Sequence, residues 1–433
     1  MNQYIKKNYL NFKFTKQLIN NYFSFGSQVL LGFFITIIII SKFGTDQLGV
    51  FTQTYALFVI FSQLAVFGLN ESVLKKVSIS KINNQENILI INAIIAAILN
   101  GIIFSFIIFI FSNSISMIFD SNSLKESNQY IFIAIFFITL NKVMISIIQA
   151  KKLFNLYAFL NALRPFLIFS ILVVMIYLEK KNSYGLIFAF SEIILFLLIL
   201  ILFNIKKYLI TNNVNLDCIK SHYYFSSKVF LNSFFSESFI RIDILMIGFL
   251  LDDIQVGFYS LAALFFEGLY QFSIVIRNII NPDLAILYFE KKYNELINLI
   301  KYFCLISFII IILSSIVIYN LFPLLFFLID FNIIQESHYL LKFLLIGLVF
   351  YSLVIPCENL LFQSNNPFWQ SIYMLTLTII NIVLNYIFIK KYGLVGAAIA
   401  TAMVYSISFI IFNFFVISVT DLNRGIYIQI KQK

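Results

Sequence analysis

The fold of this 433-residue chain is decided by stretches such as residues 88–112, ILIINAIIAAILNGIIFSFIIFIFS, which contain no charged side chain. A helix of about 20 apolar residues crosses the hydrocarbon core of a bilayer. Lipid offers no hydrogen-bonding partner to the backbone, so such a segment must be helical. The whole chain shares this character, since 61% of its residues are hydrophobic, 12% are charged and the mean hydropathy is +0.93. A water-soluble domain has to present more polar surface, so the sequence predicts an integral membrane protein.

Twelve segments are long and apolar enough to span a bilayer. They cover approximately residues 18–40, 50–69, 88–112, 129–149, 157–178, 184–203, 229–251, 256–280, 299–320, 338–362, 368–389 and 393–418. The loops between them are short, and none is long enough to form a soluble domain. We therefore expect an all-α integral membrane protein with about 12 transmembrane helices.

Basic residues in the loops predict the orientation, because cytoplasmic loops carry an excess of Lys and Arg. Alternate connections hold 19 basic residues on one side against 6 on the other. The richer side has Lys6, Lys7, Lys13, Lys16, Lys75, Lys76, Lys81, Lys151, Lys152, Lys206, Lys207, Lys220, Lys228, Lys291, Lys292, Lys301, Arg424, Lys431 and Lys433; the other has Lys42, Lys125, Lys180, Lys181, Lys390 and Lys391. Both termini are therefore expected in the cytoplasm. The net charge of +10 follows from these loops, and nucleic acid is not an expected partner.

A weak internal repeat divides the spans six and six. Gly49 and Gly257 are 208 residues apart, as are Gly185 and Gly393, in a chain with only 14 glycines. The repeat predicts two six-helix halves, residues 1–210 and 211–433. Six spans per half is an even number, so the halves share one orientation, and a pseudo-twofold axis along the membrane normal should relate them around a central cavity.

Three stretches together resemble the polysaccharide flippases of the Wzx type, within the multidrug, oligosaccharidyl-lipid and polysaccharide (MOP) exporter superfamily. They are FGTDQLGVFTQTYALFVIFSQLAVFGLNESVLKK (43–76), RIDILMIGFLLDDIQVGFYSLAALFFEGLYQFSIVIRNIINPDLA (241–285) and KKYGLVGAAIATAMVYSISFIIFNFF (390–415). The most specific part is the series Arg241, Asp243, Gly257, Tyr259, Glu267 and Pro282. The resemblance implies translocation of an undecaprenyl-diphosphate-linked oligosaccharide across the bacterial cytoplasmic (inner) membrane.

One position departs from this pattern. Such flippases often carry Arg after the second span, where this chain has Lys75 and Lys76. A lysine is a point charge without the planar fork of arginine, so bidentate anion binding is not expected there.

Charged side chains inside the membrane are costly and mark candidate functional sites. We predict Arg241, Arg164 and Lys142 as substrate-binding cations, because guanidinium and ammonium groups neutralise phosphate. We predict carboxylates that bind a coupling proton or sodium ion at four positions. These are Glu237, Asp243, Glu267 and Glu192.

Geometry along the seventh span refines these roles. Glu237 and Arg241 are four residues apart and can pair on one helix face, whereas Asp243 lies about 200° around from Arg241. The competing interpretation is that Glu237 and Arg241 form only a structural ion pair.

Other polar residues have simpler interpretations. Arg277 and Glu358 lie near helix ends and are expected to snorkel toward the interface, and His222 and His338 are expected to be solvated. Cys218, Cys304 and Cys357 are widely spaced and form no CxxC motif, so neither a disulfide framework nor a metal site is expected, and no cofactor is implied.

The leading functional hypothesis is a flippase for an O-antigen or capsule repeat unit, the route to lipopolysaccharide or capsule, working by alternating access with an ion gradient. A polysaccharide polymerase and a chain-length regulator are its expected protein partners, besides membrane lipid. The resemblance leaves open a lipid II flippase and a cation-coupled multidrug exporter. A membrane glycan polymerase is a distant alternative, since the outer loops are short, and no GxxxxGK[ST], HExxH or GxSxG motif indicates an enzyme.

Overall fold

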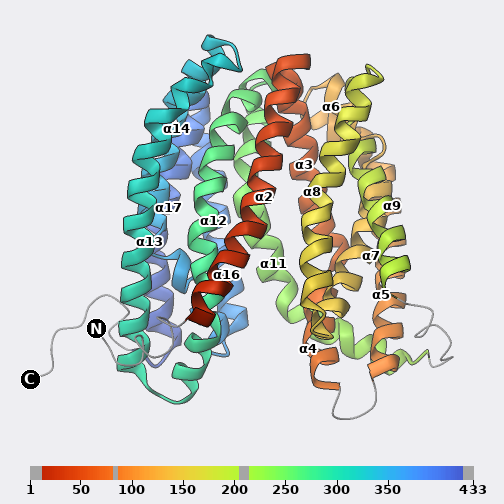
Figure 1. The fold of residues 1–433 in the computed structure, drawn as a ribbon, viewed down its shortest axis with the longest axis vertical. Coiled ribbons are helices and arrows are strands. Elements are labelled where there is room, and N and C mark those ends of the chain that lie inside the picture. The colour runs from red at the N-terminus through yellow and green to blue at the C-terminus, as the bar shows by residue number, and fades with distance from the viewer. Residues whose placement is uncertain (1–11, 81–85, 204–213, 423–433) are drawn as a thin grey trace, which may run out of the picture. The chain divides into compact units, whose positions relative to one another are not determined.

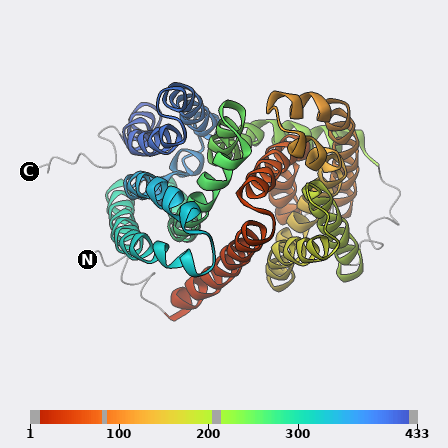
Figure 2. The same cartoon turned by 90° about the horizontal axis from the view of Figure 1, so that it is seen from above.

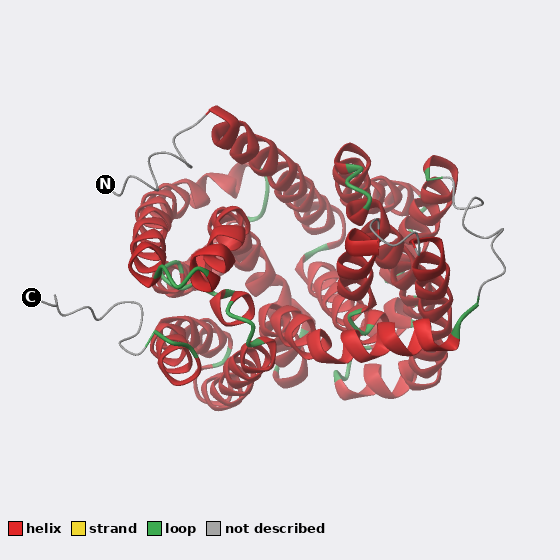
Figure 3. Ribbon diagram, turned by 90° about the horizontal axis from the view of Figure 1, so that it is seen from below, coloured by secondary structure: helices red, strands yellow, loops and turns green. Residues whose placement is uncertain are grey.

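The computed structural model of the protein describes residues 12–80, 86–203 and 214–422, and every regular element in these ranges is a helix (Figure 3). Twelve of the helices are long. They are α2 (Phe12–Phe43), α3 (Thr45–Val66), α5 (Glu86–Ile118), α7 (Ile131–Ala150), α8 (Phe154–Tyr177), α9 (Tyr184–Leu202), α11 (Leu216–Leu250), α12 (Asp253–Phe289), α13 (Tyr293–Leu321), α14 (Phe331–Tyr351), α16 (Pro367–Tyr392) and α17 (Leu394–Val419).

Ten of these helices are both long and apolar enough to cross a membrane. The other two are α2, which is apolar over Gln28–Phe43, and α11, which carries charged residues along its length. A helix occupies each of the twelve predicted segments, so the expected all-helical membrane fold is confirmed.

Shorter helices fill the connections between the long ones. They are α4 (Leu69–Ser80), α6 (Asn122–Asn128), η1 (Phe322–Phe327), η2 (Ile355–Cys357) and α15 (Leu360–Gln363). The first follows a sharp break, because Phe67 and Gly68 adopt left-handed φ angles of 49° and 70° and end α3. The polar stretch after the second predicted span is therefore a separate helix.

The chain forms two compact units. The N-terminal unit comprises residues 34–257, and the C-terminal unit comprises residues 1–33 and 258–433. These limits differ from the expected halves 1–210 and 211–433, because α11 packs against α3, α4 and α5 and so joins the N-terminal unit. The internal repeat of two six-helix halves stays a prediction.

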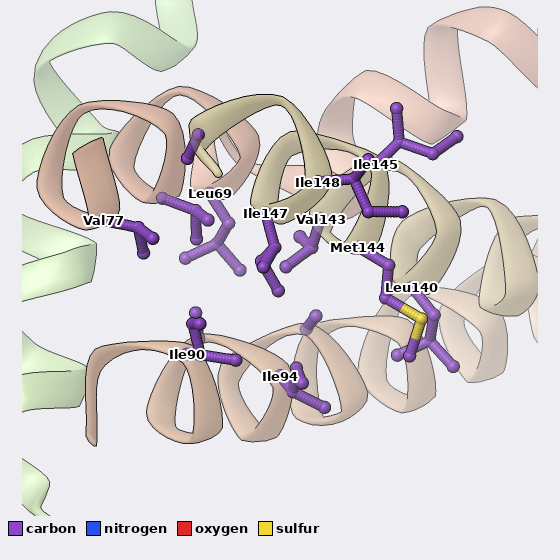
Figure 4. Packing of buried hydrophobic residues seen from close by; sticks show 14 of the residues in the cluster. Leu69, Val77, Ile90, Ile94, Leu140, Val143, Met144, Ile145, Ile147 and Ile148 are labelled. Carbon is purple, nitrogen blue, oxygen red and sulfur yellow. The ribbon is translucent and has the colours of Figure 1, made fainter. Parts of the chain in front are cut away.

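In the N-terminal unit α7, α8 and α9 run side by side (Figures 1 and 2). One face of α7 packs on α4 and α5 through Val143, Ile147, Leu69 and Ile90, which are fully buried or nearly so (Figure 4). Lipid is as apolar as these side chains, so close van der Waals packing holds the helices together. This core fixes the relative positions of the helices that carry the polar groups described below.

The N-terminal turns of α3 and α12 approach each other very closely. A Cβ on Gly49 would lie 1.8 Å from the Asp253 carbonyl oxygen, and one on Gly257 would lie 2.1 Å from the Thr45 carbonyl oxygen. Only glycine permits this contact of backbone on backbone. The contact is reciprocal, since Thr45 and Asp253 are separated by the same 208 residues as Gly49 and Gly257.

Side-chain hydrogen bonds reinforce this crossing. The Asp253 carboxylate accepts from Gln53 Nε2 at 2.6 Å and from Ser121 Oγ at 2.6 Å. The first helical residue of α12 is thereby tied both to α3 and to the loop before α6.

Candidate functional site

A buried ion pair between α8 and α9 anchors a polar cluster in the N-terminal unit. Arg164 Nε lies 2.7 Å from Glu192 Oε1, and the Glu192 side chain is completely buried. Asn141 Nδ2 on α7 donates to Glu192 Oε2 at 2.7 Å and to its carbonyl oxygen at 2.9 Å. Arg164 on α8 thus neutralises the carboxylate of α9, and Asn141 on α7 hydrogen-bonds it, which is the condition for keeping a charge away from water.

Lys142 follows Asn141 on α7 and brings a second cation to the cluster. Its Nζ donates to Ser62 Oγ on α3 at 3.0 Å. The ammonium lies in the electrostatic field of Glu237, Arg164 and Glu192. In the described residues it forms no ion pair within 4.0 Å, so this positive charge has a hydroxyl partner but no carboxylate bound to it.

Arg241 on α11 contacts an aromatic ring of α3. Its Cζ lies 5.2 Å from the centroid of the Tyr55 ring, a cation–π geometry. Glu237 lies one turn before Arg241 on the same helix. Glu237 contributes its charge to the surroundings of Lys142.

Stacked aromatic rings line the same region of α3 and α9. The rings of Phe58 and Phe188 are parallel with centroids 5.0 Å apart, and Tyr55 lies 5.7 Å from Phe188. Phe51 meets Tyr184 edge-on at 5.4 Å. The aromatic group is rigid, because such rings have few rotatable bonds and interlock.

The other two predicted coupling carboxylates are Asp243 and Glu267. Asp243 is buried on α11 of the N-terminal unit, with 3% of its surface exposed, and Glu267 is half-buried on α12 of the C-terminal unit. The structure therefore brings together Arg164, Glu192, Lys142 and Glu237 from the predicted set, and adds Asn141 and Ser62, which the sequence did not single out. Asn141 and Ser62 are uncharged, so a search for charged residues within predicted spans does not identify them.

Arg277 and Glu358 do not snorkel toward the interface as expected. Arg277 Nη1 lies 2.5 Å from Glu358 Oε2, and the side chains are 18% and 1% exposed. Tyr351 Oη also donates to Glu358. A charge buried in protein is stabilised by an opposite charge and by hydrogen bonds, and this carboxylate receives both. The sequence could have indicated this pair, because it places one positive and one negative side chain in two different predicted spans.

A ladder of aromatic rings packs against this ion pair in the C-terminal unit. Tyr351 stacks on Tyr270 with centroids 6.0 Å apart and on Tyr405 at 4.6 Å, and Phe266 stacks on Tyr405 at 5.4 Å. The rings come from α12, α14 and α17. Nearby, the thiols of Cys304 and Cys357 are 4.0 Å apart, although 53 residues separate them.

His222 is not solvated, contrary to the expectation. It is fully buried in the first turns of α11, and its Nδ1 lies 2.9 Å from Ser72 Oγ on α4. Burial, together with the nearby Lys76 ammonium, lowers the pKa of His222 to about 4. The imidazole is therefore neutral at physiological pH and joins α4 to α11.

Lys342 is a further intramembrane cation that the sequence reasoning missed. It lies in the middle of α14, and its Nζ sits 4.2 Å from the centroid of Tyr339 and 4.8 Å from that of Phe343. A lysine inside a membrane span is itself the signal that should have identified it.

In chemical terms the N-terminal cluster offers fixed positive charge inside a membrane helix bundle. The Arg164 guanidinium is already neutralised by Glu192, whereas the Lys142 ammonium is not paired, so the cluster can bind an anion at Lys142 without first breaking an ion pair.

Residues 43–327 match the model of a family described as polysaccharide biosynthesis protein. No sequence among curated proteins matches the chain.

Three solved structures illustrate the shared fold. A multidrug resistance MATE family transporter of the MOP superfamily, in an inward-facing conformation, is 16% identical, with a TM-score of 0.77 over 90% of this chain and 94% of that one. The lipid II flippase MurJ, inward closed, is 19% identical, with a TM-score of 0.73 over 93% and 87%. A MOP superfamily transporter from Pyrococcus furiosus is 13% identical, with a TM-score of 0.66 over 93% and 95%.

These structures show the fold of MOP-superfamily transporters, and the family match covers well over half of the chain. The protein is a multi-pass membrane protein with a transporter fold. It belongs to the polysaccharide biosynthesis protein family.

Proposed function

We propose that this protein is a flippase that translocates an undecaprenyl-diphosphate-linked oligosaccharide, an O-antigen or capsule repeat unit, across the bacterial cytoplasmic membrane. The observation that carries the proposal is the charge cluster of Lys142, Arg164 and Glu192 inside the membrane helices of a chain of this family. A flippase must compensate the diphosphate while it is away from water, because an unpaired anion in low dielectric is very costly. The polyprenyl tail would stay in lipid while the head group passes.

In this proposal Lys142 binds the diphosphate directly. Arg241 is the second cation, and Arg164 acts with Glu192 as a fixed pair that holds α8 and α9 in place. Glu237 is the preferred coupling group because its charge reaches Lys142, with Asp243 and Glu267 as further candidates. Transport would then follow alternating access by rocking of the two halves.

Lys142→Met is expected to reduce the rate of flipping in proteoliposomes by roughly 10- to 100-fold. A hydrogen bond to a charged group contributes about 1.5–3 kcal/mol, and 1.4 kcal/mol corresponds to a factor of about ten. The assay follows a fluorescent undecaprenyl-diphosphate oligosaccharide, and thermal unfolding checks that the variant is intact. Lys228→Met is the control, since that lysine is exposed on α11, over the ring of Tyr224. Equal rates for Lys142→Met and the control would refute the role of Lys142.

A substrate panel distinguishes the alternatives. The structural similarity to MurJ favours lipid II as the second candidate, and the similarity to a multidrug transporter adds organic cations. Proteoliposomes that flip lipid II, or extrude a cationic dye, but leave the oligosaccharide lipid on its original face would replace the proposed function.

The proposed orientation is tested by cysteine labelling. Two hydrogen bonds bring the predicted outer loops to one end of the N-terminal unit, Ser121 with Asp253 and Asn182 with Glu126. In a cysteine-free background Asp252→Cys should react with a membrane-impermeant maleimide on intact cells. Lys220→Cys, at a position where the lysine side chain is 78% exposed, should react only after permeabilisation. The reverse pattern would invert the predicted topology. Labels at Asn84 and Asn213, in predicted cytoplasmic loops, should also not react from outside the cell; both positions lie outside the described residues.

A further inference from the structure

A cavity of about 470 Å³ lies in the C-terminal unit, beside α13, α14 and the start of α17. Its walls carry Tyr319 from α13 and Gln335, Glu336, Tyr339 and Lys342 from α14. This volume is within the range of sites that bind small molecules. The lining combines aromatic rings, an amide, a carboxylate and an ammonium group.

Lys342 gives the cavity a positive charge deep in the helix. It is 11 residues from Phe331 and 9 from Tyr351, so it lies about 16 Å and 13 Å along the axis from the two ends of α14. The ammonium rests over Tyr339 and Phe343, and in the described residues it forms no ion pair with a carboxylate. An intramembrane cation in this state is stabilised only in part by ring faces, and an anionic ligand would stabilise it further.

The aromatic side of the cavity is rigid. The ring of His338 stacks on Tyr319 with centroids 4.2 Å apart and on Phe322 at 5.6 Å. His338 Nε2 lies 3.0 Å from the Tyr319 carbonyl oxygen, which links α13 to α14. Tyr339 keeps 47% of its surface exposed, so a ring face is available to a ligand.

These groups match the chemistry of a sugar acid. The C–H face of a pyranose packs on an aromatic ring, sugar hydroxyls exchange hydrogen bonds with amide and carboxylate groups, and a carboxylate pairs with an ammonium. Glu336 argues against a diphosphate as the occupant. It is six residues before Lys342, about 9 Å along the axis, so it would repel a multiply charged anion while accepting hydrogen bonds from hydroxyls.

We propose that this cavity binds an acidic sugar, a residue bearing a carboxylate, in the oligosaccharide head of the substrate, with Lys342 as the group that recognises the carboxylate. The inference rests on the proposed function, since it names the chemistry of the saccharide that the flippase would carry. It assigns to the C-terminal unit a specificity site separate in sequence from the Lys142 cluster.

The test uses two synthetic undecaprenyl-diphosphate disaccharides that differ only in the terminal sugar, glucuronate in one and glucose in the other. Proteoliposomes of the wild type should flip the glucuronate lipid about tenfold faster. Lys342→Met should remove this preference by slowing the glucuronate lipid alone, and Lys342→Arg should keep it. Lys391→Met is the matched control, because that lysine also lies over a tyrosine ring of the same unit, at 5.1 Å from Tyr392, outside the cavity.

The outcomes separate this inference from the proposed function. Flipping of both lipids at equal rates, unchanged by Lys342→Met, would overturn the inference and leave the proposed function standing. Equal slowing of both lipids by Lys342→Met would assign Lys342 to the shared diphosphate and also overturn the inference.

If neither lipid is flipped, the proposed function fails, and a binding experiment tests the inference instead. It is saturation-transfer NMR of the detergent-solubilised protein with free glucuronate and glucose. A glucuronate signal that is present for the wild type and disappears for Lys342→Met supports it, and equal signals for both sugars and both proteins refute it.

Discussion

Glu358→Ala is expected to lower the free energy of unfolding by about 3–5 kcal/mol, the cost of removing one partner of a buried ion pair. Arg277 would be left with its charge inside the C-terminal unit, and Tyr351 would lose the acceptor of its hydroxyl. The measurement is thermal unfolding of the detergent-solubilised protein, together with the yield of inserted protein. The loss should greatly exceed that of an ordinary surface substitution.

The double variant Arg277→Met, Glu358→Leu should recover most of this stability, because apolar residues of similar volume replace a buried pair at little cost. Glu290→Ala is the control, because it also removes one carboxylate from an ion pair, but from a pair that is not buried. It breaks the pair of Glu290 with Lys292 at 2.6 Å, whose side chains are about half exposed, and pairs of that kind contribute little. If Glu358→Ala were as stable as Glu290→Ala, the ion pair would not support the unit.

Gly49→Ala is expected to destabilise the N-terminal unit by an amount at the upper end of the ~1–3 kcal/mol typical of overpacking. The added methyl would lie 1.8 Å from a backbone oxygen of Asp253, and backbone cannot move aside as a flexible side chain can. Gly257→Ala should behave in the same way, since its methyl would meet the Thr45 carbonyl oxygen at 2.1 Å. Both effects are read from the unfolding temperature in detergent.

Gly32→Ala provides the control for helix propensity. It lies within α2, and its Cβ would meet Leu264 Cδ1 at 3.5 Å, an ordinary contact. Alanine is the better helix former, so this variant should be neutral or slightly stabilised. A Gly49→Ala protein as stable as Gly32→Ala would show that the N-terminal turns of α3 and α12 do not pack as closely as described.

The twelve helices were predictable because the bilayer imposes a local rule. Each span must satisfy its own backbone and be apolar for about 20 residues, so a segment such as 88–112 identifies itself without reference to any other. The same holds for most intramembrane charges, since Lys142, Arg164 and Glu192 stand out against apolar neighbours, although Lys342 was missed. Gly49 and Gly257 were also visible in the sequence as members of a 208-residue spacing.

The sequence could not predict which charged side chains pair with each other, because pairing depends on which helix faces come together. Glu237 has Arg241 one turn away, yet the described structure forms the tight pair between Arg164 and Glu192 on neighbouring helices. Arg277 and Glu358 were expected at the interface because each lies near the end of a predicted span, and the 81 residues between them gave no sign of their contact. His222 was expected to be solvated because it precedes the predicted span 229–251, but α11 begins at Leu216 and packs against α4.

The sequence alone therefore determined the class of the protein, its spans and most of its costly charges, since each of these is a property of a single segment in lipid. Only the tertiary structure decided which charges neutralise one another and which, such as Lys142 and Lys342, keep no carboxylate partner in the described residues. The physical reason is that a buried charge is stabilised by groups within a few ångströms. Those groups come from other helices, and the sequence does not show which helices are neighbours.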